Sequence, residues 1–214
     1  MRVKITKLVI LFLLATALFP LLGACASGAK TSEGGSLVVN EIVSSNKRSL
    51  TDEALGTPDW IELYNAGTSE IDLSGYGVSD NMRKLHKFVF PDGTVLGAGE
   101  YLVLYATTLD EGADAGSALC TNFGLSKSGD YLFVTDAFYG IVAQIEVPAL
   151  YTDVSYARAA DGTYGFCAVP TPNAANSDSI FATLNEVFAA QNLDQLTISE
   201  VMPNALALDL ASVV

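Results

Sequence analysis

The feature that most limits the fold of this chain is a series of short apolar runs, each about five to seven residues long, separated by turn-forming residues. The runs are rich in β-branched and aromatic residues, which favour strands, and they are LVVNEIV (37–43), DWIELYN (59–65), HKFVF (86–90), EYLVLYA (100–106), DYLFVTD (130–136) and GIVAQIEV (140–147). No segment before residue 178 keeps a helical spacing of apolar residues. Strands without intervening helices predict an antiparallel sandwich or barrel.

The first 24 residues have the pattern of an export signal. Basic residues at positions 2, 4 and 7 precede an almost unbroken apolar run from Leu8 to Leu22, and small residues then lead to Cys25. The pattern resembles the lipobox of bacterial lipoproteins, in which the cysteine carries the lipid; the alternatives are an ordinary signal peptide or an uncleaved anchor helix. We predict that a lipid on Cys25 attaches an extracytoplasmic chain to a membrane, with residues 25–35 as a flexible tether.

Beyond this leader the chain is strongly acidic. Three of the 11 Lys and Arg lie in the leader and all 24 Asp and Glu lie after it, so the formal charge of the remainder is 8 − 24 = −16. Such a surface repels phosphate backbones, which argues against a nucleic-acid partner. It suits solubility and the binding of divalent cations at an extracytoplasmic face. The expected partner there is a protein or a cell-wall glycan.

Two further cysteines, Cys120 and Cys167, follow the leader. In an oxidising compartment they are a candidate disulfide, which would close a long loop and stabilise the fold. The alternative is two separate thiols, each in the place of a small core residue.

The C-terminal part shows a change of pattern. Two prolines in PTPNAANS (170–177) predict the end of sheet pairing, and helix-like apolar spacing over 178–195 predicts a short amphipathic linker. LTISEVMPN (196–204) then echoes LVVNEIVSS (37–45). Residues 196–214 are therefore expected to be the start of a truncated second repeat, either frayed or borrowing an edge of the first domain.

Several phrases in order resemble the lamin-tail domain of bacterial surface lipoproteins. They are VVNEIVSSN (38–46), PDWIELYNAG (58–67), IDLSGYGVSD (71–80), KFVFPDGTVLGAGEYLVLYA (87–106), TNFGLSKSGDYLFVTD (121–136) and PTPNAAN (170–176). The resemblance implies an immunoglobulin-like antiparallel β-sandwich over 36–177, used as an accessory module and sometimes placed ahead of a spore-coat-H-like kinase domain. This sequence carries no kinase signature of its own.

The stretch DWIELYN holds the only tryptophan between two carboxylates. Because side chains on a strand alternate between faces, Ile61 and Leu63 are expected in the core, while Trp60, Glu62 and Tyr64 share the opposite face, partly exposed or covered by loops. Asp59 and Glu62 then point to opposite faces, so this strand alone supplies no facing acid pair of the glycosidase kind.

The acids also suggest a cation site. Glu41 is expected to share a face with Val39 and Val43 and to meet Glu62 if their strands are neighbours. Oxygen ligands for calcium would then come from a weak candidate set: Glu41, Asp52, Glu53, Asp59 and Glu62. The alternative is that each acid accepts hydrogen bonds from loop amides and holds the 46–57 loop against the sheet.

One basic cluster stands out from the acidic background. Arg83, Lys84, His86 and Lys87 are a candidate contact for an anionic partner, or simply a solvated hairpin arm. His86 is the only histidine, so nucleophile–histidine catalysis has little support and a multi-histidine zinc site is excluded within this chain. Tyrosines on strands either stack on sugars or pack across the sheet.

These observations favour a non-enzymatic, lipid-anchored module for adhesion, protein interaction or presentation of a missing C-terminal domain. No catalytic residue and no cofactor are predicted. Two alternatives remain: the N-terminal fragment of a larger surface enzyme, such as a spore-coat-H-like kinase or a hydrolase, and a calcium- or glycan-binding module.

Overall fold

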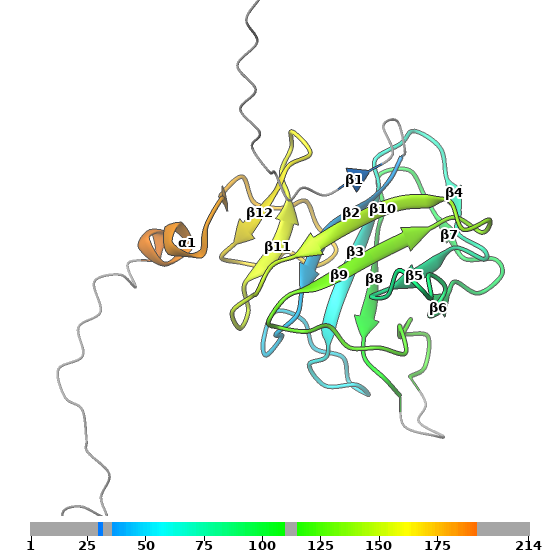
Figure 1. The fold of residues 1–214 in the computed structure, drawn as a ribbon, viewed down its shortest axis with the longest axis horizontal. Coiled ribbons are helices and arrows are strands. Elements are labelled where there is room, and N and C mark those ends of the chain that lie inside the picture. Colours follow the sequence, from blue (N-terminus) through cyan, green and yellow to red (C-terminus); the bar gives the residue numbers. More distant parts are fainter. Residues whose placement is uncertain (1–29, 32–35, 110–114, 192–214) are drawn as a thin grey trace, which may run out of the picture.

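The computed structural model describes residues 30–31, 36–109 and 115–191. They form two antiparallel sheets packed against each other, with the strand orders β1-β10-β9-β5-β6 and β13-β12-β11-β2-β3-β8, and a small third sheet of β4 and β7 (Figure 1). The strands are β1 (Lys30–Thr31), β2 (Leu37–Val43), β3 (Asp59–Asn65), β4 (Ile71–Asp72), β5 (Gly77–Ser79), β6 (Phe88–Val89), β7 (Val95–Leu96), β8 (Tyr101–Ala106), β9 (Asp130–Thr135), β10 (Ile141–Val147), β11 (Ser155–Arg158), β12 (Tyr164–Cys167) and β13 (Ile180–Phe181). The predicted all-β, immunoglobulin-like sandwich is confirmed.

Apolar side chains from the inner faces of both sheets form one core. Ile61 and Leu63 of β3 belong to it, as strand alternation predicts, and so do Leu132 and Val134 of β9 in the other sheet. All four are at most 1 % exposed. Because full burial of such a side chain contributes about 1.5–3 kcal/mol, the alternating apolar positions largely determine which face of each strand turns inward.

A β-bulge in β2 changes which of its side chains face the core. The register of β2 against β3 shifts between Val39 and Glu41, with Val39 opposite Leu63 and Glu41 opposite Glu62. The extra residue, Asn40, therefore puts Val39 on the core face and Glu41 on the outer face. The prediction that Val39 and Glu41 share a face is wrong for this reason.

The chain returns to the six-stranded sheet after the prolines. Ile180 and Phe181 form β13, which pairs with Phe166 and Cys167 of β12. The prediction that pairing stops at 170–177 is therefore wrong, because the two prolines lie in the loop between β12 and β13, where they remove no ladder hydrogen bond.

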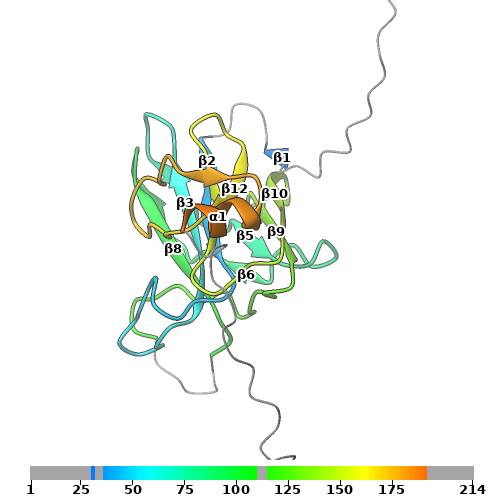
Figure 2. The ribbon, with the colours of Figure 1, turned by 90° about the vertical axis from the view of Figure 1, so that its left-hand side faces the viewer.

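The only helix of the described residues is α1 (Leu184–Ala190), shorter than the predicted linker over 178–195. Thr183 caps its N-terminus, and Glu186 completes a capping box. Val187 is fully buried, so α1 packs on β12 and β13 rather than standing apart as a connector. Figure 2 views the molecule from this end.

The N-terminal expectations are only partly within the described residues. Lys30–Thr31, in the expected tether, pair with β10 as a two-residue strand. The predicted signal peptide, Cys25 and the expected second repeat at 196–214 lie outside the described residues. Among the residues that are described, no helix has the length and apolar character needed to cross a membrane.

Candidate functional site

Two glutamates lie side by side on the outer face of the six-stranded sheet. Glu41 of β2 and Glu62 of β3 are direct cross-strand partners, and neither has any exposed surface. Direct partners point to the same face, with Cβ atoms about 5 Å apart. The meeting of these two acids, which the sequence suggested, is therefore present.

Glu41 is held by a strand and by a loop. Its Oε1 accepts a hydrogen bond from Ser155 Oγ of β11 at 2.5 Å. Its Oε2 accepts from the backbone N–H of Thr171 at 2.8 Å and from Thr171 Oγ1 at 3.3 Å. Thr171 belongs to residues 170–177, called the proline loop below. The carboxylate thus fastens this loop onto the sheet.

Glu62 holds the same loop through a backbone amide and an asparagine bridge. Asn173 N donates to Oε2, and Asn40 Nδ2 donates to Oε1 at 2.8 Å. Amide hydrogen bonds of 3.1 Å join Asn40 to Asn176, whose Nδ2 also donates to the carbonyls of Asn40 and Arg158, each at 2.9 Å. All four carboxylate oxygens of the pair are therefore hydrogen-bonded to the protein itself.

Burial raises the pKa of both carboxyls. For Glu62 the loss of solvent is the largest cause, the charge of Glu41 adds to it and the hydrogen bonds from Asn173 and Asn40 oppose it, so that its pKa is about 7. Burial likewise raises the pKa of Glu41, against the hydrogen bonds that it accepts. An acid near neutral pH suits general acid–base chemistry, but here the chain covers both carboxyls and leaves a substrate no access.

Sequence reasoning missed the hydrogen-bond donors to this pair, which are Asn40, Ser155, Thr171 and Asn173. The phrase PTPNAAN was read as a boundary, although a buried carboxylate requires donors and this loop is rich in them. The hydrogen-bond donors of the loop can be read from its sequence, but their pairing with glutamates more than 100 positions away cannot.

Residues 46–57 cover the other end of the same face. Asn46 N donates to Asp59 Oδ1 at 2.9 Å, and Trp60 Nε1 donates to Ser49 Oγ at 3.1 Å. Trp60 is fully buried, so it offers no aromatic platform to solvent. The expectation that strand acids hold this loop is right for Asp59, whereas the two glutamates hold the proline loop instead.

The remaining candidate cation ligands do not converge on the pair. Asp52 Oδ1 accepts from the amides of Ala54 and Leu55 within its own turn, at 2.8 and 2.9 Å, and Glu53 is exposed. Within the described ranges, no group of three or more His, Cys, Asp or Glu side chains is placed to hold a metal ion.

The basic cluster does not form one site either. Arg83 and Lys84 are exposed, whereas Lys87 Nζ is paired with Asp80 at 2.6 Å. The His86 ring stacks on a tyrosine ring with 3.8 Å between centroids. Only Arg83 and Lys84 therefore remain open to an anionic partner.

The candidate disulfide is not formed, and the alternative of two separate buried thiols holds. Cys120 and Cys167 are both buried free thiols. Cys167 is on β12. Cys120 lies beyond the outer edge of β8, where its backbone pairs with that of Tyr105 in an isolated β-bridge. With strands about 4.8 Å apart, five steps across the sheet separate them by roughly 24 Å, far beyond disulfide reach.

An open cleft adjoins the proline loop on the outer face. Its volume is about 560 Å³. Tyr64 of β3 and Tyr101 of β8 line it, with rings stacked at 4.6 Å between centroids. The other lining residues are Asn40, Arg158, Ala159, Ala160, Asp161, Ala175, Asn176, Ser177, Asp178 and Ile180. We call it the tyrosine cleft.

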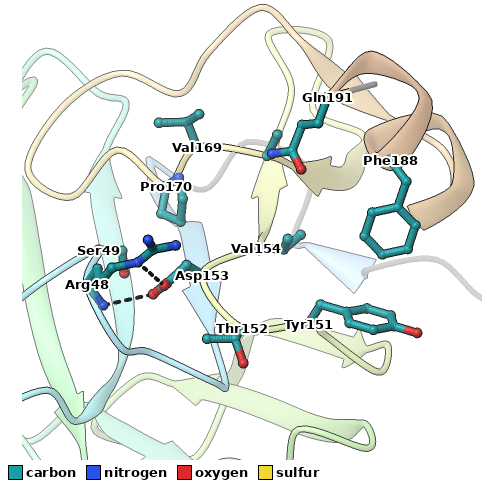
Figure 3. A pocket seen from close by; sticks show the side chains of 11 residues that line it. Arg48, Ser49, Tyr151, Thr152, Asp153, Val154, Val169, Pro170, Phe188 and Gln191 are labelled. Atoms are coloured by element: carbon teal, nitrogen blue, oxygen red, sulfur yellow. Dashed lines mark hydrogen bonds and ion pairs between the residues drawn. The ribbon is translucent and has the colours of Figure 1, made fainter. Parts of the chain in front are cut away.

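A second hollow of about 500 Å³ lies where α1 meets the loops before β11 and after β12 (Figure 3). Arg48 Nε pairs with Asp153 Oδ2 at 3.0 Å, and Asp153 Oδ1 accepts from the amides of Lys47 and Arg48. The Phe188 ring of α1 meets Tyr151 edge-on, with 5.1 Å between centroids. The contacts of Asp153 join two loops that are distant in sequence, and the contact of Phe188 with Tyr151 holds α1 against one of them.

Comparison with known proteins places the fold in a family. A model of the Lamin Tail Domain matches residues 30–148, more than half of the chain. A search of curated proteins found no match. The matched region runs from β1 through β10, and the sandwich continues beyond it with β11, β12 and β13. The chain therefore belongs to the Lamin Tail Domain family.

Proposed function

We propose that this chain is a non-catalytic recognition module, attached to the outside of a bacterial membrane by a lipid on Cys25. Its role is adhesion, protein interaction or the presentation of a further domain. The lipobox pattern ahead of Cys25 and the −16 charge of the rest of the chain support the location. Membership of a family with an immunoglobulin-like sandwich supports recognition, because such folds carry their function on loops and edges.

The burial of the glutamate pair is the observation that supports a function without catalysis. The pKa of Glu62, about 7, suits proton transfer, and burial raises the pKa of Glu41 as well. Neither side chain is exposed, however, and every carboxylate oxygen is hydrogen-bonded to the chain. The acids are used to fasten the proline loop. Catalysis by this pair would require that loop to leave the sheet.

Carboxyl footprinting tests this part. The full chain is treated with a carbodiimide and glycine ethyl ester, and modified residues are mapped by mass spectrometry. We expect exposed Glu53 to be labelled in the folded chain, and Glu41 and Glu62 only after unfolding. Labelling of Glu62 at the rate of Glu53 in the folded chain would contradict the proposal.

Lipid labelling tests the location. The full chain is produced in a bacterial host fed an alkyne-bearing fatty acid, beside a Cys25→Ser variant as the matched control. We expect label and salt-resistant membrane association for the unchanged chain and loss of the label for the variant. Label that persists in the variant, or an unlabelled chain in the soluble fraction, would refute the anchor.

A further inference from the structure

The tyrosine cleft has a preformed aromatic wall. Tyr64 and Tyr101 are direct partners in the β3–β8 ladder, and their rings are inclined by only 22°. Neither hydroxyl makes a hydrogen bond within the part of the chain that the structure describes. Both rings are half-buried, so each keeps an accessible portion and a hydroxyl able to donate and accept.

The floor of the cleft is rigid. Asn40 and Asn176 line it and are locked by their mutual amide bonds. Asn40 is in turn bonded to Glu62 beneath the proline loop. A ligand entering the cleft would therefore meet groups that are already ordered, which lowers the entropic cost of binding.

Carboxylates at the rim supply further acceptors. Asp161 Oδ1 accepts from the amide and hydroxyl of Thr163, and the side chain is exposed. Asp178 is exposed. With Arg158 as the one basic lining residue, the formal charge of the lining is 1 − 2 = −1. This lining does not concentrate anions, whereas its carboxylates accept hydrogen bonds from hydroxyl groups.

We propose that the tyrosine cleft binds a neutral hexose unit of an extracellular polysaccharide. The C–H face of the sugar packs on the outer face of the stacked tyrosine pair, and its hydroxyls donate to Asp161 and Asp178. The volume of about 560 Å³ falls within the usual range for small-molecule sites. This inference names a ligand class for the recognition module and so rests on the proposed function.

Titration calorimetry of the detergent-purified full chain tests the inference. The neutral probes are cellohexaose, maltohexaose and mannohexaose, and the anionic probe is tetragalacturonate. We expect at least one neutral probe to bind and tetragalacturonate not to bind. Tyr101→Ala should lower the affinity for the neutral probe by about tenfold or more, because a stacking surface is lost.

Two variants keep the result independent of folding. Asp178→Asn is an exposed change that should weaken binding a few-fold without altering thermal unfolding. Tyr131→Ala removes an exposed tyrosine of the other sheet, 46 % exposed, and should leave the affinity unchanged. The inference fails if no neutral probe binds, if tetragalacturonate binds as tightly, or if Tyr131→Ala and Tyr101→Ala weaken binding equally. Failure here, with Cys25 lipidated and Glu62 protected, would leave the proposed function standing.

Discussion

The six-stranded sheet covers the polar groups of its outer face with loops, whereas the five-stranded sheet leaves part of its outer face open. On the first, Glu41 and Glu62 are fully buried and every carboxylate oxygen has a donor. On the second, Tyr131 is 46 % exposed, and the buried Nε2 of His86 has no hydrogen-bond partner among the described residues.

The difference shows what a buried charge demands of a fold. A carboxylate without water needs several donors in fixed positions, and these come from segments far apart in sequence. The proline loop, the glutamate pair and the floor of the tyrosine cleft therefore form one hydrogen-bonded unit. Exposed positions of the other sheet, such as Tyr131, need no such unit and should tolerate substitution.

Removal of Glu62 should give the largest effect. Glu62→Ala leaves a cavity and deprives Asn173 N and Asn40 Nδ2 of their acceptor, so we expect the free energy of unfolding to fall by about 3 kcal/mol. Denaturant titration of the full chain measures it. Gln144→Ala, on the outer face of β10, is the control and should change stability by no more than about 0.5 kcal/mol. An equal loss of stability in Glu62→Ala and Gln144→Ala would show that the outer faces of the two sheets do not differ in this respect.

The pH dependence of the free energy of unfolding should be of about the same size. The pKa of Glu62 is raised to about 7 in the folded chain from an unfolded value of 4.5, so between these pH values the folded state holds the proton that the unfolded state has released. Stability therefore decreases as pH rises through this window, by about 3 kcal/mol for the full shift. The lowered pKa of Asp153 does not oppose this trend, since its effect is confined to more acidic pH.

Unfolding curves collected from pH 5 to 8 check this prediction. Glu62→Gln is the matched control, because it keeps the shape of the side chain and cannot titrate. We expect its profile to lose most of the slope. A slope of the same size in Glu62→Gln would assign the effect to another group.

The class of the fold could be predicted because strand alternation is local. The alternation of Ile61 and Leu63 identifies the core face of β3 within one short segment. Turn-forming residues mark where the strands end. The bulge at Asn40 has no comparable signal, since it depends on the register between β2 and β3. It alone brings Glu41 onto the face of Glu62.

The candidate site was predicted only in part for a related reason. The sequence shows both glutamates, but two of the backbone amides that donate hydrogen bonds to them, those of Thr171 and Asn173, lie more than 100 positions away. Such pairing is a product of tertiary structure and leaves no periodic pattern. The return of the chain at β13 was concealed in the same way, because prolines in a loop do not indicate where pairing resumes.

Loss of the asparagine bridge should have an intermediate effect. Asn176→Ala removes the donor to the carbonyls of Asn40 and Arg158, and we expect a loss of about 1.5 kcal/mol in the free energy of unfolding. The exposed Asn185 of α1 provides the control, since Asn185→Ala should alter stability by less than about 0.5 kcal/mol. Thermal unfolding of both variants compares them. An unchanged Asn176→Ala variant would mean that the proline loop is held without the bridge.

The smallest effect is expected on the open face, at His86. Its ring lies between the backbone at Gly77 and the ring of Tyr139, and its buried Nε2 makes no hydrogen bond within the described residues. His86→Phe keeps the stacking and removes an unpaired polar atom, so the free energy of unfolding should change by less than about 0.5 kcal/mol. Tyr139 is 60 % exposed and can move to admit the larger ring. His86→Ala, measured beside it by urea titration, should cost about 1 kcal/mol because stacking is lost. A lower free energy of unfolding for His86→Phe than for His86→Ala would contradict this expectation. It would mean that the imidazole nitrogen has a hydrogen-bond partner, as the buried polar atoms of the six-stranded sheet do.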